Sequence, residues 1–234
     1  MSNNNYWSLD QSIIQFKNKS LNDFFYSEKY LLNLIKNNFE SVLDIGCASG
    51  KFIELLNQYS NYFSYYGIDF VEEQIRIANK NYNYKNYNFV LGDFLTFKFK
   101  KKYDLVNATG IIQHTYDFKN ILLKMISLSC KYVIFDFKVS NEIKNLTNID
   151  QSFIKMSNDI LPYIVFSKKY IFDFLKNQKE IEDIVFIGYE TRNNKNAVIY
   201  SDIKKLYSVG VLIKLNQNNN TKKEINISGK YLVN

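Results

Sequence analysis

Three carboxylates stand at or near the ends of successive apolar segments, and their spacing suggests a ligand site. Asp44 follows Val42 and Leu43, Asp69 closes the segment 63–70, and Asp93 lies near the end of 87–94. In an open α/β sheet, ligands bind at the carboxyl ends of the strands, near the point where strand order reverses. We therefore expect these acids to share one edge of a sheet and to face a small molecule.

The turn after Asp44 narrows the choice of ligand. It reads Gly-Cys-Ala-Ser-Gly over residues 46–50, and its glycines let the backbone approach a ligand closely. Ala48 and Lys51 occupy positions at which the dinucleotide-binding fingerprint G-x-G-x-x-G has glycines. The Gly-Lys-Ser/Thr sequence that ends a phosphate-binding loop is also absent. Asp44 would repel a pyrophosphate, so a cationic or zwitterionic ligand fits better. Asp69 could accept hydrogen bonds from both hydroxyls of a ribose.

The elements that must position these groups follow from hydrophobic periodicity. A helical preface over 1–40, with Ser27 as a candidate cap, precedes alternating strands and helices, which indicates βαβ units and a parallel sheet. We expect strands at 41–46, 63–70, 87–94, 103–110, 131–137, 182–190 and 206–215, and helices at 50–60, 72–82, 120–130 and 167–178. Ser167 is the expected N-cap of the last helix. Residues 138–165 look polar and irregular, and the tail 216–234 looks loose or like an edge hairpin.

At this point the sequence resembles the class I S-adenosylmethionine-dependent methyltransferases. The resemblance rests on VLDIGCASGKF (42–52), YYGIDF (65–70), FVLGDF (89–94), YDLVNATGIIQHT (103–115) and YVIFDF (132–137). It implies an α/β, Rossmann-like fold with a seven-stranded, mostly parallel sheet, an antiparallel seventh strand and helices on both faces. We expect one methyltransferase domain over 1–234, divided into the preface 1–40, a cofactor-binding core 41–137, substrate-side loops and C-terminal strands 138–215, and the tail 216–234.

The same resemblance implies S-adenosylmethionine as the cofactor and assigns roles by position. The methionine end would lie against Asp44, Gly46, Cys47, Ala48, Ser49 and Gly50. Asp69 would hold the ribose with Phe70 against the adenine, and Asp93 would accept from the adenine amino group with Phe94 beside it. Asn107 and Ala108, at the end of the fourth predicted strand, would touch the methionine portion, and Gln113 would touch the cofactor or the substrate. Core packing is the alternative for the two phenylalanines, and a purely backbone role is favoured for Cys47.

His114 is the only histidine in the chain and the expected catalytic residue. It follows the fourth predicted strand, in a loop that faces the methyl group in this fold. An imidazole titrates near neutral pH and could deprotonate a hydroxyl. A substrate contact and a structural hydrogen bond are the alternatives. Tyr116, Asp117 and Asp136 are further candidates.

A metal site is not indicated by the cysteines. Cys47 and Cys130 are far apart and form no ligand pair, so we expect neither a zinc site nor a disulfide. Cys130 follows an apolar helical pattern and is expected to be buried.

The methyl acceptor is less well defined. The Asn-Pro-Pro-Tyr-like motif that adenine, cytosine and glutamine-amide methyltransferases use after the fourth strand is absent. Residues 107–110 read Asn-Ala-Thr-Gly instead, which argues against those acceptors. The stretches 159–175, 189–200 and 209–215 look similar to small methyltransferases of bacterial capsule and surface-glycan biosynthesis. That favours a hydroxyl of a sugar, nucleotide-sugar or phosphate-bearing small molecule. An RNA or protein methyltransferase, and a non-catalytic cofactor-binding protein, are the alternatives.

The positive charge does not decide between these functions. The net charge is +7, but the densest lysine runs, within 98–102 and at 222–223, are short. We interpret them as solvated surface, with a nucleic-acid face as the alternative. The same interpretation is favoured for Lys138, Lys168, Lys169 and Arg192, although each could meet a phosphate. No signal peptide and no membrane span are expected, so the expected location is cytoplasmic. The oligomeric state cannot be inferred from the sequence.

Overall fold

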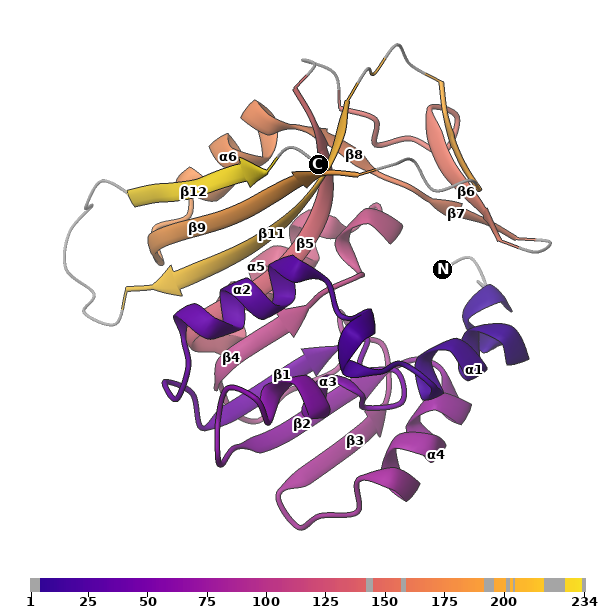
Figure 1. The fold of residues 1–234 in the computed structure, drawn as a ribbon, viewed down its shortest axis with the longest axis vertical. Helices are drawn as coiled ribbons and strands as arrows, with labels where there is room; N and C mark the ends of the chain where they lie inside the picture. Colours follow the sequence, from indigo (N-terminus) through magenta and orange to yellow (C-terminus); the bar gives the residue numbers. More distant parts are fainter. Residues whose placement is uncertain are drawn as a thin grey trace.

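The computed structural model describes residues 5–141, 145–156, 159–191, 196–200, 203, 205–216 and 226–232. A nine-stranded sheet runs through the molecule in the order β12-β9-β11-β5-β4-β1-β2-β3, and β8 (Val165–Ser167) pairs with β5 off this path (Figure 1). The other strands are β1 (Ser41–Ile45), β2 (Ser64–Asp69), β3 (Tyr87–Leu91), β4 (Tyr103–Ala108), β5 (Ser129–Ser140), β9 (Ile181–Glu190), β11 (Leu206–Leu215) and β12 (Asn226–Leu232).

The first five strands are parallel, as their apolar runs and intervening helices predict. β1 pairs with β2 on one side and with β4 on the other, and Asp44 is the register partner of both Gly67 and Asn107. The strand order therefore reverses between β1 and β4. The carboxyl end of β1 is the place in such a sheet where a ligand binds.

The last part of the sheet contains the expected antiparallel strand. β11 lies between β5 and β9 and is antiparallel to both, which confirms the predicted fold class. The tail, expected to be loose or an edge hairpin, instead contributes β12, which pairs with β9 in parallel. The hairpin expectation was wrong because β12 pairs with β9 and not with β11, the strand that precedes it in the chain.

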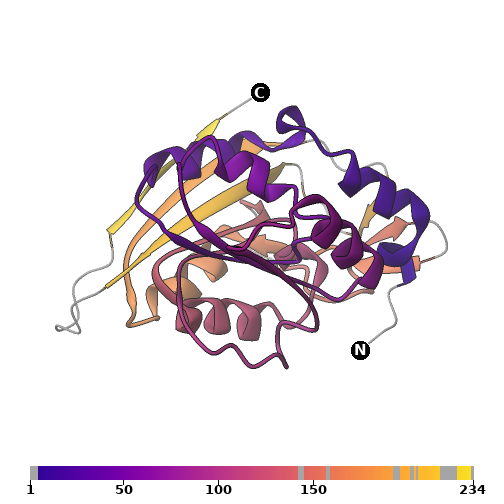
Figure 2. The same cartoon turned by 90° about the horizontal axis from the view of Figure 1, so that it is seen from below.

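Helices cover both faces of the sheet (Figure 2). One face carries α2 (Tyr26–Leu34), α3 (Phe52–Leu56) and α4 (Glu72–Asn81), whose apolar residues join one buried cluster with Phe39, Tyr65 and Leu105. The other face carries α5 (Phe118–Leu128) and α6 (Lys168–Lys176), which belong to a second cluster. α1 (Asp10–Lys17) contacts α4 near the carboxyl ends of the strands.

Residues 138–165 are more regular than their sequence suggests. β5 continues to Ser140, and β6 (Ser152–Met156), β7 (Asp159–Pro162) and β10 (Ala197–Ile199) form a separate three-stranded sheet. The 3-10 helix η1 (Asn5–Ser8) reaches this sheet, because Tyr6 is buried in one cluster with Leu161 and Tyr163. The segment before β1 and the segment after β5 therefore meet beside the carboxyl ends of the central strands.

Of the predictions for the two helix caps and for the burial of Cys130, one cap is confirmed and the other two predictions were wrong. The Ser167 hydroxyl accepts a hydrogen bond from the Tyr170 N–H at 3.2 Å, which confirms the cap of α6. Ser27 does not cap α2, which begins at Tyr26; the Glu28 carboxylate accepts from the Phe25 N–H at 2.7 Å and caps the helix instead. Cys130 is exposed, contrary to expectation, because α5 ends at Leu128 and Cys130 belongs to the start of β5.

No helix among the described residues has the length and apolar character needed to cross a membrane.

Candidate active site

A cavity lies at the carboxyl ends of β1 and β4, under the segment that precedes β1. It encloses about 420 Å³, part of it open to solvent. The chain before β1 contributes Phe16, Lys19, Phe24 and Glu28, and the central strands and the turn contribute Asp44, Gly46, Cys47, Ala48, Ser49, Lys51, Phe52, Asn107 and Thr109. The cavity therefore brings together the methionine-end residues expected from the sequence, except Gly50 and Ala108.

Asp44 is the central acid of this cavity. It is buried, its Oδ2 accepts a hydrogen bond from the Tyr65 hydroxyl, and its Oδ1 accepts from the Asn107 amide at 2.7 Å. Burial raises the pKa of Asp44 to about 6, although both hydrogen bonds oppose that shift. A bound cation would lower this pKa again, so the site favours a ligand with a positive group.

The backbone of the turn is held in an unusual conformation. Gly46, Ala48 and Gly50 have φ angles of 67°, 44° and 81°. A Cβ at Gly50 would lie 2.9 Å from the Phe89 ring, so the close packing requires glycine there. Ala48 is a non-glycine residue in the left-handed region, which strains the turn.

Asp69 braces the same turn. Its Oδ2 accepts from the Ala48 N–H at 2.8 Å, and its Oδ1 accepts from the Val71 N–H at 2.9 Å. Burial raises the pKa of this carboxyl group. Each oxygen of a carboxylate can accept a second hydrogen bond, so these contacts are compatible with a further ligand.

Asn107 carries a buried acceptor without a partner. Its Nδ2 donates to Asp44, but its Oδ1 makes no hydrogen bond to any described residue, and the side chain is 2% exposed. A buried, unsatisfied carbonyl oxygen is costly unless a ligand donates to it. Asn107 also lines the cavity, so the unsatisfied oxygen belongs to a residue at the place where a ligand would bind.

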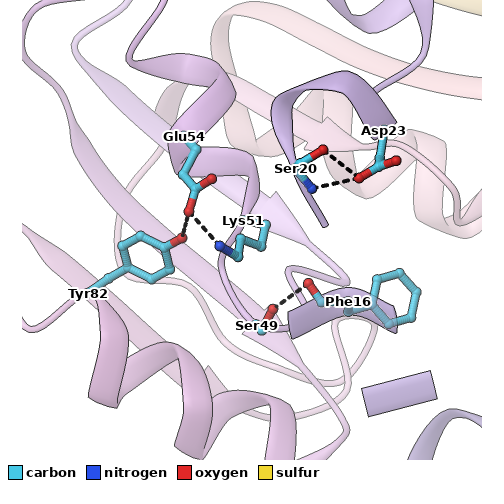
Figure 3. A network of polar contacts seen from close by, with 7 residues as sticks. All are labelled: Phe16, Ser20, Asp23, Ser49, Lys51, Glu54 and Tyr82. Atoms are coloured by element: carbon cyan, nitrogen blue, oxygen red, sulfur yellow. Dashed lines mark hydrogen bonds and ion pairs between the residues drawn. The ribbon is translucent and has the colours of Figure 1, made fainter. Parts of the chain in front are cut away.

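The segment before β1 adds residues that the sequence analysis missed. The Ser49 hydroxyl donates to the Phe16 carbonyl oxygen at 3.0 Å, which ties this segment to the turn (Figure 3). The ammonium group of Lys19 lies 3.7 Å from the centre of the Phe24 ring. Glu28 is buried on the packed face of α2, and burial raises the pKa of its carboxyl group. An acid on the apolar face of a helix could have been noticed in the sequence; Lys19 carries no such signal.

The two lysines of the cavity differ in their pairing. Lys51 forms an ion pair with Glu54 at 2.7 Å, and the Tyr82 hydroxyl donates to the same carboxylate oxygen at 2.7 Å (Figure 3). Lys19 has no ion pair within the described ranges. Lys19 is therefore the cation available to an anionic ligand group.

The residues expected near the adenine lie outside this cavity. Phe70 is 58% exposed, and Asp93 is half-buried and accepts from the Leu95 N–H at 2.7 Å. Phe94 is buried in the core on the α5 side, where the ammonium group of Lys124 lies 5.1 Å from its ring centre.

His114 ends the 3-10 helix η3 (Ile112–His114), beyond β4. Its Nδ1 lies 2.9 Å from the carbonyl oxygen of Pro162. A carbonyl only accepts, so Nδ1 carries the proton and Nε2 keeps its lone pair. Burial lowers the pKa of His114 to about 4, so the ring is neutral at physiological pH. Trp7 and Tyr163 lie beside it, with ring centres at 5.6 and 6.2 Å.

Asp136 extends the polar groups from the cavity toward β5. It is buried and accepts from the Gly110 N–H at 2.5 Å. Burial raises the pKa of its carboxyl group, and the nearby ammonium of Lys138 opposes that shift. Lys138 itself donates to the Ser208 hydroxyl. A Cβ at Gly110 would meet nothing within 4 Å, so open space adjoins this end of β4.

The remaining candidates lie elsewhere. Tyr116 and Asp117 are exposed, and Gln113 is buried with an unpartnered Oε1. Arg192, Lys222 and Lys223 lie outside the described residues. Within the described ranges, no group of three or more histidine, cysteine, aspartate or glutamate side chains could hold a metal ion.

Comparison with known proteins identifies the family and the fold. The family model of a methyltransferase domain matches residues 36–161, and the chain belongs to that family. Its fold is that of the class I S-adenosylmethionine (SAM)-dependent methyltransferases. No curated protein sequence matches the chain.

Solved structures share the fold at low sequence identity. The N-terminal domain of EvdMO1, crystallised with S-adenosylhomocysteine (SAH) and D-fucose, is 13% identical, with a TM-score of 0.60 over 81% of this chain and 82% of that one. A SAM-dependent methyltransferase from Clostridium acetobutylicum is 15% identical, with a TM-score of 0.56 over 88% and 98%. Magnesium protoporphyrin IX methyltransferase from Synechocystis, with bound SAM, is 14% identical, with a TM-score of 0.56 over 91% and 94%.

Proposed function

We propose that this methyltransferase acts on a hydroxyl group of a small molecule: a sugar, nucleotide-sugar or phosphate-bearing intermediate of bacterial capsule or surface-polysaccharide synthesis. The observation that supports hydroxyl chemistry most is His114, a neutral imidazole whose Nδ1–H is used by Pro162 and whose Nε2 keeps its lone pair. The sugar class draws support from the structural likeness to the EvdMO1 domain that was crystallised with D-fucose.

The cavity residues fit the amino-acid end of SAM. The ammonium group of Lys19 would pair with the carboxylate, and Asp44, Glu28 and the unpartnered Oδ1 of Asn107 would accept from the α-amino group. The backbone of residues 46–50 would lie against the same end. Toward the nucleoside, Asp69 and Phe70 would meet the ribose and adenine, and Asp93 would complete that side, whereas Phe94 packs in the core. Ala108 and Gln113 would border the site beyond β4.

The protein itself has few chemical tasks in this reaction. When bound, SAM supplies a methyl group that is attached to a positively charged sulfur. The sulfur is the leaving group and keeps the electron pair of the carbon–sulfur bond that breaks. The protein must orient the acceptor oxygen and receive its proton. Nε2 of His114 is the proposed proton acceptor. Trp7 and Tyr163 would provide an apolar wall for a sugar ring.

The proposal is tested by measuring SAH release with a panel of nucleotide-sugars, sugar phosphates and free sugars. Turnover of one of these acceptors in the wild type, lost in His114→Asn, would support it. Asn is the informative substitution because its amide can still donate to the Pro162 carbonyl while Nε2 is removed. His114→Gln is the second variant: its amide oxygen can accept a hydrogen bond in place of Nε2 but cannot take a proton, so it should also be inactive if His114 acts as a base. Turnover only with RNA or protein substrates would contradict the proposal and favour the alternative class.

A further inference from the structure

A second hollow lies at the opposite edge of the sheet from the cofactor cavity. It encloses about 820 Å³, part of it open to solvent, where β2 and β3 begin and the β3–β4 connection ends. Its walls include three aromatic residues and three lysines: Tyr66, Phe97, Phe99, Lys98, Lys100 and Lys101. None of these residues lines the cofactor cavity, so this hollow is a separate feature.

The charged residues that line this hollow all have one sign. Lys98, Lys100 and Lys101 are exposed, and no aspartate or glutamate lines the hollow with them. Within the described ranges none of these lysines forms an ion pair, and the carboxylate of Asp104 pairs with Lys131 at 3.3 Å. Three uncompensated ammonium groups on one short segment repel one another, and a polyanion would relieve that repulsion.

The hollow is also lined by aromatic rings. Tyr66, Phe97 and Phe99 are half-buried, with ring centres 4.8 Å apart for Phe97 and Phe99 and 6.1 Å for Tyr66 and Phe99. The ammonium group of Lys101 lies 5.2 Å from the centre of the Tyr103 ring. Lysines that follow a phosphate backbone beside aromatic faces are the combination by which proteins hold single-stranded nucleic acid. The amide of Asn88, an exposed side chain, adds a group that could hydrogen-bond a base edge.

We propose that this hollow binds nucleotides, with Lys98, Lys100 and Lys101 at the phosphates and Tyr66, Phe97 and Phe99 against the base. The ligand could be a free nucleotide or a nucleotide within single-stranded RNA, which present the same chemistry. The lysine run within 98–102 would then bind phosphates and would not be only a solvated surface. The site is too far along the sheet to present a base to the cofactor cavity, so it would recruit a nucleotide-bearing molecule rather than hold the group that is methylated.

The test is fluorescence anisotropy of a labelled oligouridylate of about ten nucleotides, at about 50 mM salt, with the full chain. The triple variant Lys98→Gln/Lys100→Gln/Lys101→Gln should bind about tenfold or more weakly. Its slope of log affinity against log salt should be shallower by about 2, since each phosphate contact on a single strand contributes about 0.7. The matched control is Lys36→Gln/Lys176→Gln/Lys179→Gln, which removes three exposed lysines outside the hollow and should bind as the wild type does.

Competition separates the possible ligands. Displacement of the probe by uridine diphosphate would assign the site to free nucleotides, and displacement by unlabelled oligonucleotide alone would assign it to RNA; either result supports the proposal. Equal displacement by inorganic pyrophosphate would overturn it, because the aromatic wall would then contribute nothing. Absence of binding by the wild type, or equal binding by the triple variant, would also overturn it. SAH binding, measured by calorimetry on the same variants, reports on the methyltransferase site independently.

Discussion

The Asn107 amide donates to the Asp44 carboxylate at 2.7 Å and joins the ends of β1 and β4 across the point where the strand order reverses. Asp44 is thereby held as an acceptor, while the Oδ1 of Asn107 is left without a partner. The pair is costly in the free protein, because it combines a buried carboxylate with an unsatisfied oxygen. A bound α-amino group would satisfy both.

Asp44→Asn should make the free protein more stable at neutral pH while weakening SAH binding. Burial raises the pKa of Asp44 from 3.8 to about 6. The stability linked to its protonation is therefore complete below pH 3.8 and is lost as the pH rises through about 6. That loss amounts to about 3 kcal/mol at most. Denaturant unfolding at pH 4 and pH 7 should show this difference in the wild type and a smaller one in the variant. An unchanged pH dependence would contradict the role of Asp44.

Asp69→Ala should weaken SAH binding by about 2 kcal/mol, or about thirtyfold, if the carboxylate accepts from the ribose. It should also lower the free energy of unfolding, because the N–H groups of Ala48 and Val71 lose their acceptor. Calorimetry and denaturant unfolding separate the two effects. Reduced stability with unchanged affinity would leave Asp69 only its bracing role.

Ala48→Gly should raise the free energy of unfolding by about 1 kcal/mol, because glycine tolerates the left-handed backbone that strains alanine. The φ angle of Ala48 is 44°. Ala78→Gly is the matched control, since Ala78 lies within α4 and the same substitution there should destabilise by about 1 kcal/mol. Destabilisation in both variants would show that Ala48 is not strained.

His114 should stay neutral between pH 5 and pH 8, since burial lowers its pKa to about 4. It is the only histidine in the chain, so its ring nitrogens give unambiguous NMR signals. We expect the Nδ1–H tautomer throughout this range, fixed by the Pro162 carbonyl. Titration with a midpoint near 6.5 would show that the ring is solvated and that the bond to Pro162 is not maintained.

Much of the sheet could be predicted because its signals are local. The spacing of Asp44 and Asp69 behind apolar runs indicated strand ends, and the small turn residues indicated where a ligand could approach. The boundaries of β11 follow directly from its apolar run. Ser167 was recognisable as a cap because the helix that it begins is strongly amphipathic.

The rest depends on contacts between distant segments. Lys19 reaches the cavity only because the chain before β1 folds over the turn, and no pattern around Lys19 indicates that. β12 has a partner, β9, that precedes it by about forty residues, which local periodicity cannot reveal. The low pKa of His114 follows from burial beneath Trp7 and Tyr163, which come from two other parts of the chain.

The central claim is that the cavity under Lys19 holds the amino-acid end of the cofactor. Calorimetry should compare SAH with 5′-methylthioadenosine, which lacks that end, in the wild type, in Lys19→Gln and in Lys51→Gln. We expect SAH to bind the wild type about a hundredfold more tightly, a preference of about 3 kcal/mol for the charged contacts. Lys19→Gln should reduce that preference about tenfold, and Lys51→Gln should keep it because Lys51 is paired with Glu54. Equal affinities of the wild type for the two ligands would contradict the claim.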